Sequence, residues 1–101
     1  QHIAMMKPNA IVINVARGAV TDERALADAV AGGCLGGLGV DVYSFEPMAE
    51  DHPFAEIMQL PNVCLTPHMA WGSYEARNRC VRRMAENIKE FFAGNIHNRI
   101  C

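Results

Sequence analysis

The sequence predicts an α/β fold: a three-stranded parallel sheet with a crossover helix and a long C-terminal helix. Three short apolar runs carry this prediction, because they are nearly continuous rather than alternating, as is typical of parallel strands buried on both faces. The first two runs are far enough apart for the crossover that parallel neighbours require. A chain of 101 residues, half of them apolar, is globular and amounts to one domain or part of one.

The predicted strands span residues 11–15, 38–42 and 63–66. Between the first two, Thr21 or Asp22 can cap the start of a helix, and Gly32-Gly33 is suited to ending it. The apolar residues of this helix follow the spacing i, i+3, i+4, which places them on one face: Leu26, Ala29 and Val30. The resulting strand–helix–strand unit should cross over in the right-handed sense.

A short helix is expected over residues 54–59, and a long helix from about residue 73 to residue 93. Ser73 can cap the long helix, Gly94 can end it, and the tail, residues 95–101, is predicted to be irregular. Apolar residues recur along the long helix at helical spacing and form one stripe suited to burial: Val81, Met84, Ala85, Ile88, Phe91 and Phe92. With three strands alone, we expect one side of the sheet and this stripe to be exposed.

The composition argues against two classes of partner. A formal net charge of −2, from 9 basic and 11 acidic residues, provides no basic surface for nucleic acid. No apolar stretch approaches the roughly 20 residues of a transmembrane helix, and the first ten residues lack the charged and apolar regions of a signal peptide. We therefore expect neither a nucleic-acid partner nor a membrane partner.

The four cysteines, at positions 34, 64, 80 and 101, follow neither a zinc pattern nor a dense disulfide framework. The first three fall in or beside predicted elements, so we interpret them as reduced packing residues of a cytoplasmic protein. The histidines at positions 2, 52 and 97 show no ligand spacing with one another or with cysteine, and no metal site is predicted.

Polar side chains mark the carboxyl ends of all three predicted strands. Arg17 follows the first strand. Asp41 and Glu46 lie at and beyond the end of the second, and His68 follows the third. Ligands of open α/β sheets bind beyond this edge, so we expect the four residues to converge there. Taken singly, each also fits an ordinary role: a surface arginine, a turn-capping aspartate, a solvated loop glutamate, and a loop or core histidine.

An arginine, a carboxylate and a histidine together suit one kind of reaction. The guanidinium fork of Arg17 can bind a carboxylate through two hydrogen bonds. His68 can give or take a proton near neutral pH, and Glu46 can hold the ring in one tautomer and favour its protonated form. A substrate with a carboxylate beside a carbonyl would fit this set, with Arg17 on the carboxylate and His68 protonating the carbonyl oxygen as hydride reaches the carbon.

Three stretches resemble a known family, the D-isomer-specific 2-hydroxyacid dehydrogenases. They read MKPNAIVINVARGAVTDERAL, GLGVDVYSFEP and NVCLTPHMAW, in the family's order and at its spacing. The resemblance implies a partial Rossmann-type, doubly wound parallel sheet. It also implies an oxidoreductase acting on a small 2-hydroxy or 2-oxo acid, with NAD as the default cofactor and NADP not excluded. The chain looks most like the glycerate dehydrogenase/hydroxypyruvate reductase side of the family.

The resemblance implies roles for single residues. Arg17 matches the arginine that binds the substrate carboxylate, Glu46 the acid that pairs with the histidine, and His68 the general acid/base. Asp41 matches a residue that contacts the nicotinamide carboxamide. Backbone contacts to the nicotinamide end of the cofactor are implied for Val15, Ala16, His68, Met69, Ala70 and Trp71, and Arg17 is counted among the cofactor contacts as well. The formate dehydrogenases of the superfamily carry glutamine where this chain has Glu46, which argues against that branch.

The chain departs from the family in length. Members are roughly three times as long and carry a glycine-rich phosphate loop, G-x-G-x-x-G, that this sequence lacks. We expect residues 1–72 to be the C-terminal half of an NAD-binding domain, and residues 73–101 to be a long helix and tail that return toward a substrate domain outside this sequence. The full-length enzyme is expected to be a homodimer. Two other interpretations stay open: a cofactor-sensing regulator on the same fold, and an inactive truncated product.

Overall fold

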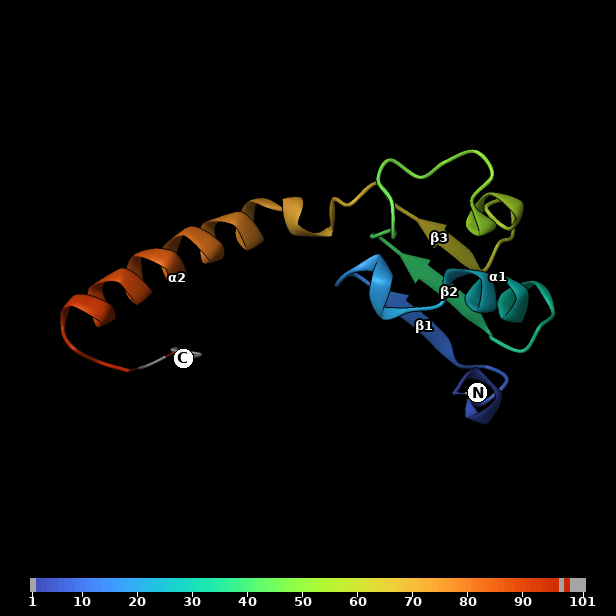
Figure 1. The fold of residues 1–101 in the computed structure, drawn as a ribbon, viewed down its shortest axis with the longest axis horizontal. Coiled ribbons are helices and arrows are strands. Elements are labelled where there is room, and N and C mark those ends of the chain that lie inside the picture. The colour runs from blue at the N-terminus through green and yellow to red at the C-terminus, as the bar shows by residue number, and fades with distance from the viewer. Residues whose placement is uncertain (1, 97, 99–101) are drawn as a thin grey trace. The chain divides into compact units, whose positions relative to one another are not determined.

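The computed structural model describes residues 2–96 and 98 (Figure 1). It divides the chain into two compact units, of which the first ends at Ala70 and the second begins at Trp71. The predicted α/β class is confirmed, with a parallel sheet of order β1-β2-β3 in the first unit and a long helix, α2, in the second. Part of the predicted tail, residues 97 and 99–101, lies outside the described residues.

The sheet consists of β1 (Ile11–Asn14), β2 (Gly37–Val40) and β3 (Val63–Leu65). Asn14 pairs with Val40, and Val40 pairs with Leu65, so the three strands finish level with one another. Each strand is shorter than predicted at its carboxyl end. The residues that leave the ladder there begin the loops that carry the candidate site, and the level finish brings those loops to one edge of the sheet.

The crossover helix is α1 (Glu23–Ala31), and its ends follow the sequence prediction. Of the two predicted caps, Asp22 is the one used, since its side chain accepts a hydrogen bond from the Ala25 amide at 3.0 Å. The helix ends at Gly32, and Gly33 adopts the left-handed backbone, φ +70°, that glycine tolerates best. The buried face of α1 comprises Leu26, Ala27, Ala29 and Val30.

The core lies between α1, β2 and a 3₁₀ helix, Pro53–Glu56, which lies close to α1 in Figure 1. Its largest fully buried side chain is that of Phe54. The prediction of a helix over residues 54–59 is wrong in type and extent, because the structure has a 3₁₀ helix that ends at Glu56. The chain turns again after Ile57, whose carbonyl oxygen accepts from the Leu60 amide, because a helical conformation is disfavoured just before Pro61.

The expectation of strands buried on both faces holds for β2 but is wrong for β1 and for β3, in which Cys64 is exposed. Along β1 burial alternates, and Ile11 and Ile13 are 68% and 69% exposed. The reason is that α1 packs against β2 and leaves this side of β1 open in the first unit. The expected exposure of one side of the sheet is confirmed. The three described cysteines, Cys34, Cys64 and Cys80, are free as predicted but are exposed rather than packed.

The second unit contains α2 (Tyr74–Phe92). The Ser73 hydroxyl caps it by accepting from the Ala76 amide at 3.1 Å, and Gly94 follows its end with φ +77°. None of its described residues is buried. The apolar stripe is therefore exposed, as expected for this chain, with its largest members at Val81, Met84, Ile88, Phe91 and Phe92.

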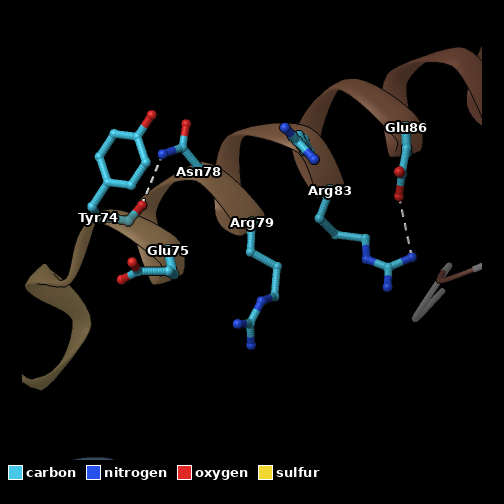
Figure 2. A pocket seen from close by; sticks show the side chains of 7 residues that line it. Tyr74, Glu75, Asn78, Arg79, Arg83 and Glu86 are labelled. Carbon is cyan, nitrogen blue, oxygen red and sulfur yellow. Dashed lines mark hydrogen bonds and ion pairs between the residues drawn. The ribbon is translucent and has the colours of Figure 1, made fainter.

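A second side of α2 is polar and forms a shallow hollow (Figure 2). The Asn78 side chain donates to the Tyr74 carbonyl oxygen at 2.9 Å, and Arg83 pairs with Glu86 at 3.3 Å. These are contacts within one exposed helix, of the kind that contribute little to stability.

Among the described residues, no helix combines the length and the apolar composition that a membrane span needs.

Truncation of Phe54 should test the assigned core. Because its ring is fully buried, Phe54→Ala should lower the free energy of unfolding by about 3–5 kcal/mol. Phe45 is the matched control, since its side chain is 84% exposed and Phe45→Ala should change that free energy by less than about 0.5 kcal/mol. Urea unfolding followed by circular dichroism measures both variants. Equal losses in the two would contradict this core.

Candidate active site

Glu46 and His68 form a close pair at the carboxyl edge of the sheet. His68 Nδ1 lies 2.7 Å from Glu46 Oε2, and each side chain is a little over one third exposed. The second carboxylate oxygen, Oε1, accepts from the Tyr43 amide at 3.1 Å. The hydrogen bond to His68 and then the one from Tyr43 lower the pKa of Glu46, with smaller electrostatic contributions from His68 and Arg17. Glu46 is therefore anionic near neutral pH and can hold the His68 ring in one orientation.

The loop after β3 is held by Asp41, which is buried directly after β2. Asp41 Oδ1 accepts from the Thr66 hydroxyl at 2.5 Å and from the Met69 amide at 2.9 Å, and Oδ2 accepts from the Ala70 amide at 2.9 Å. The Thr66 hydrogen bond is the main reason that the pKa of Asp41 is lowered. The ordinary interpretation of Asp41, as the cap of a turn, thus describes its contacts. Its contact to a cofactor stays a prediction.

His68 itself has an uncommon backbone conformation, with φ +53°. Few residues other than glycine adopt the left-handed region, and such outliers persist where the surroundings impose them. Here Asp41 imposes the left-handed conformation on His68, because it binds Thr66 on one side of His68 and Met69 on the other. The Tyr43 hydroxyl adds a further bond by donating to the Thr66 carbonyl oxygen at 3.0 Å.

The loop after β1 is shaped in a similar way by Asn14, which is also buried. Its side-chain amide donates to the Arg17 carbonyl oxygen at 2.9 Å and to the Thr21 hydroxyl at 3.3 Å. Its side-chain oxygen accepts from the Ala16 amide at 3.1 Å. Arg17 is exposed, and its Nη1 donates to the Ala16 carbonyl oxygen at 2.7 Å. The polar residue at the end of the strand thus determines where Arg17 leaves the sheet.

Gly18 lets the loops after β1 and β2 come into contact. A Cβ atom at this position would lie 2.1 Å from the Tyr43 carbonyl carbon and 2.2 Å from the Ser44 nitrogen. Such distances exclude any larger residue unless the backbone moves. Because Arg17 precedes Gly18 and Glu46 follows Ser44 by two residues, this close approach sets the position of the arginine loop against the glutamate loop.

The remaining predicted cofactor residues lie on the same loops. Val15 and Ala16 follow β1, Met69 and Ala70 follow His68, and all four are exposed. Trp71 is exposed too but begins the second unit. The structure thus brings Glu46 to His68 and Asp41 beneath the His68 loop, and it places Arg17 close enough to act on Glu46 by its charge.

A cavity of about 350 Å³ opens beside the pair. Its walls are mostly apolar, and they comprise Tyr43, Glu46, Pro47, Met48, Met58, Leu65, Thr66, Pro67 and His68. This volume lies in the range of small-molecule sites. Among the residues that the structure describes, no group of three or more histidine, cysteine, aspartate or glutamate side chains is placed to hold a metal ion.

Sequence reasoning did not identify two residues that shape the site, Asn14 and Tyr43. Asn14 left a signal, because an asparagine within an apolar run is a buried polar group that needs partners. Tyr43 left a weaker one, since a tyrosine just beyond a buried strand has an apolar ring and a hydroxyl that needs a partner. Burial raises the pKa of Tyr43, so its hydroxyl stays a donor to Thr66.

Known proteins match the chain along most of its length. Residues 1–70 match the D-isomer specific 2-hydroxyacid dehydrogenase, NAD binding domain. The glycerate dehydrogenase of Methylorubrum extorquens is 39% identical over 98 residues, which cover 97% of this chain and 31% of that protein. An acyclic imino acid reductase, solved in complex with NADPH and D-arginine, has a TM-score of 0.72 and 38% identity, over 97% of this chain and 30% of that one.

The glyoxylate/hydroxypyruvate reductase of Sinorhizobium meliloti, solved with NADP and malonate, has a TM-score of 0.65 and 34% identity, over 89% of this chain and 27% of that one. The chain thus spans under a third of the length of these relatives. The predicted partial Rossmann-type sheet is confirmed, and so is the predicted resemblance to the glycerate dehydrogenase/hydroxypyruvate reductase side of the family. The chain belongs to the D-isomer specific 2-hydroxyacid dehydrogenase family, whose NAD-binding domain it matches over residues 1–70.

Proposed function

We propose that this protein interconverts a D-2-hydroxy acid and the corresponding 2-oxo acid by hydride transfer with NAD or NADP. The observation that carries the proposal is the 2.7 Å contact between Glu46 and His68 beyond the ends of β2 and β3. A histidine with a carboxylate on one ring nitrogen suits proton transfer near neutral pH. Membership of the family supports this reaction class, and the names of the relatives favour small substrates such as glyoxylate and hydroxypyruvate.

His68 would act as the general acid and base. In reduction it gives its proton to the carbonyl oxygen while hydride arrives at the carbonyl carbon, so that C=O becomes CH–OH, and it then regains a proton from solvent. In oxidation it takes the hydroxyl proton as the C–H bond gives up its hydride. Glu46 holds Nδ1 and stabilises the charge of the protonated ring. A bound nicotinamide ring would supply or accept the hydride.

Arg17 would bind the carboxylate of the substrate. Its guanidinium is exposed at the same edge, and its charge already acts on Glu46. The rigid fork of an arginine binds a carboxylate through two parallel hydrogen bonds, which fixes the orientation of the neighbouring carbonyl as well as its position. That orientation is what proton transfer from His68 requires.

The residues of this chain fit the nicotinamide end of the cofactor. We propose backbone contacts from Val15 and Ala16 after β1 and from His68, Met69 and Ala70 after β3, with a further contact from Arg17. The contact predicted for Trp71, which begins the second unit, stays a prediction. The carboxylate of Asp41 already accepts three hydrogen bonds from the His68 loop, so its proposed part is to hold that loop against the cofactor. No residues are assigned to the cofactor phosphates, because the glycine-rich loop is absent from this sequence.

We propose that residues 1–72 are the C-terminal half of an NAD-binding domain and that residues 73–101 lead toward a substrate domain. The complete enzyme would be a cytoplasmic homodimer. The greater length of the relatives supports the first point, and the exposed stripe on α2 supports packing against further protein.

Removal of the His68 ring should abolish most turnover. In the complete protein, His68→Ala should lower the rate of glyoxylate reduction by about 10²- to 10⁴-fold, because the proton donor is lost. Binding of NADH or NADPH should change little. The matched control is His2→Ala, since His2 is exposed and distant in sequence from the site. NADH binding without turnover in the unmodified protein would instead favour the cofactor-sensing regulator.

Substitution of Arg17 by lysine should mainly weaken substrate binding. The charge is kept but the fork is lost, so KM for the 2-oxo acid should rise by about 10-fold or more while cofactor affinity is retained. Arg79→Lys on the exposed face of α2 is the control for a conservative change at a surface arginine. A silent Arg17→Lys variant in steady-state kinetics would remove Arg17 from the site.

The Glu46–His68 pair should make stability depend on pH. The folded-state pKa of Glu46 is lowered from its ordinary value of 4.5, so the folded chain binds fewer protons than the unfolded chain. The stabilisation is fully present above that ordinary value and is lost as the pH falls through the folded-state pKa. Thermal unfolding between about pH 7 and pH 3 should show this loss, and Glu46→Gln should reduce it. An unchanged pH slope in the variant would contradict the pairing.

A further inference from the structure

Glu23 and His52 form a second glutamate–histidine pair, away from the first. His52 Nε2 lies 3.1 Å from Glu23 Oε2, and the two side chains are only 10% and 13% exposed. Glu23 is the first residue of α1, and His52 precedes the 3₁₀ helix Pro53–Glu56, so the pair joins segments 29 residues apart. Neither residue is used in the proton transfer described above.

The hydrogen bonds around His52 indicate which ring nitrogen accepts and which donates. The Phe54 amide donates to His52 Nδ1 at 3.1 Å, so Nδ1 carries no proton. The ring proton is therefore on Nε2, which donates to Glu23 Oε2. The other oxygen, Glu23 Oε1, accepts from the Ser44 amide at 2.8 Å. Glu23 thus receives one donor on each oxygen, an arrangement that a side chain with a single acceptor atom cannot reproduce.

Ser44 lies within the loop that carries Glu46, and the contacts of this loop converge on two consecutive peptides, Val42–Tyr43 and Tyr43–Ser44. Its amide is bound by Glu23, and the peptide joining it to Tyr43 rests against Gly18. From the same short segment, Glu46 accepts from the Tyr43 amide and reaches His68. Displacement of the Tyr43–Ser44 peptide would therefore carry the Glu46 carboxylate with it.

We propose that Glu23 is a positioning residue for the acid–base pair: supported by His52, it holds the Tyr43–Ser44 peptide where Glu46 can reach His68. The inference rests on the proposed function and extends it to a residue that touches neither substrate nor cofactor. Small displacements of catalytic groups lower rates steeply, so a hydrogen bond two residues from Glu46 can affect turnover.

Substitution of Glu23 by glutamine tests this role. Glutamine offers one acceptor oxygen to two donors, so either the Ser44 or the His52 hydrogen bond is lost. In the complete protein, kcat for 2-oxo acid reduction should fall by about 10-fold or more, with KM and cofactor affinity nearly unchanged. Glu75→Gln is the matched control. It also removes a first-turn carboxylate, from α2 after the cap at Ser73, but Glu75 is exposed.

Repeating the Glu23→Gln substitution in a Glu46→Gln variant distinguishes a positioning role of Glu23 from a general contribution to stability. If Glu23 acts through Glu46, then Glu23→Gln should have little further effect on kcat once Glu46 is glutamine. Equal factors in both backgrounds, or an unchanged kcat with a lower melting temperature, would overturn the inference. Should Glu23→Gln fail to fold, His52→Asn replaces it, because asparagine can still cap the 3₁₀ helix but is too short to reach Glu23. The same drop in kcat is then expected.

A readout that needs no turnover distinguishes failure of this inference from failure of the proposed function. Carboxyl resonances in NMR report the pKa of Glu46, which is lowered in the unmodified chain. Glu23→Gln should return it toward the ordinary value, and Glu75→Gln should not. A Glu46 pKa that does not respond to Glu23→Gln would overturn the positioning role. An inactive protein in which it does respond would count against the proposed reaction while supporting the positioning role.

Discussion

The arrangement of the site depends on one buried carboxylate, that of Asp41. It lies directly after the central strand and accepts three hydrogen bonds from the loop that follows β3. A carboxylate out of water requires such partners, and the amides of Met69 and Ala70 supply them only if the chain turns sharply between Thr66 and Met69. His68 sits in that turn, and its left-handed backbone is the result. The orientation of the His68 ring thus follows from the hydrogen bonds that the buried Asp41 carboxylate needs.

Buried or nearly buried polar residues also hold the loops after β1 and β2. The buried Asn14 side chain finds its hydrogen-bond partners in the loop that carries Arg17. Glu23 accepts a hydrogen bond from the loop that carries Glu46. Arg17, Glu46 and His68 thus each lie on a loop whose backbone amides or carbonyl groups are hydrogen-bonded by a polar residue next to the core. Loops held in this way keep a fixed geometry without regular secondary structure, which suits a reaction sensitive to small displacements.

The apolar surfaces of the chain point to further protein. One side of β1 and the stripe on α2 are exposed, although both have the composition of buried surfaces. Soluble proteins seldom leave such patches open unless a partner or another domain covers them. The relatives, which are more than three times as long, provide a setting in which both surfaces could be covered. The Glu46–His68 contact and the hydrogen bonds from Asp41 to the His68 loop are formed within residues 41–70.

Much of this protein was determined by local sequence. Runs of apolar residues predicted the three strands, the spacing of Leu26, Ala29 and Val30 predicted α1, and Arg17, Glu46 and His68 were identified from their place after strands. Tertiary structure alone decided that Asp41 faces inward to the His68 loop, that His68 takes a left-handed backbone, and that His52 meets Glu23. The physical reason is that periodicity and capping act between near neighbours in the chain. A hydrogen bond across 29 residues depends on strand register and on which buried groups still lack partners, and both exist only once the sheet has formed.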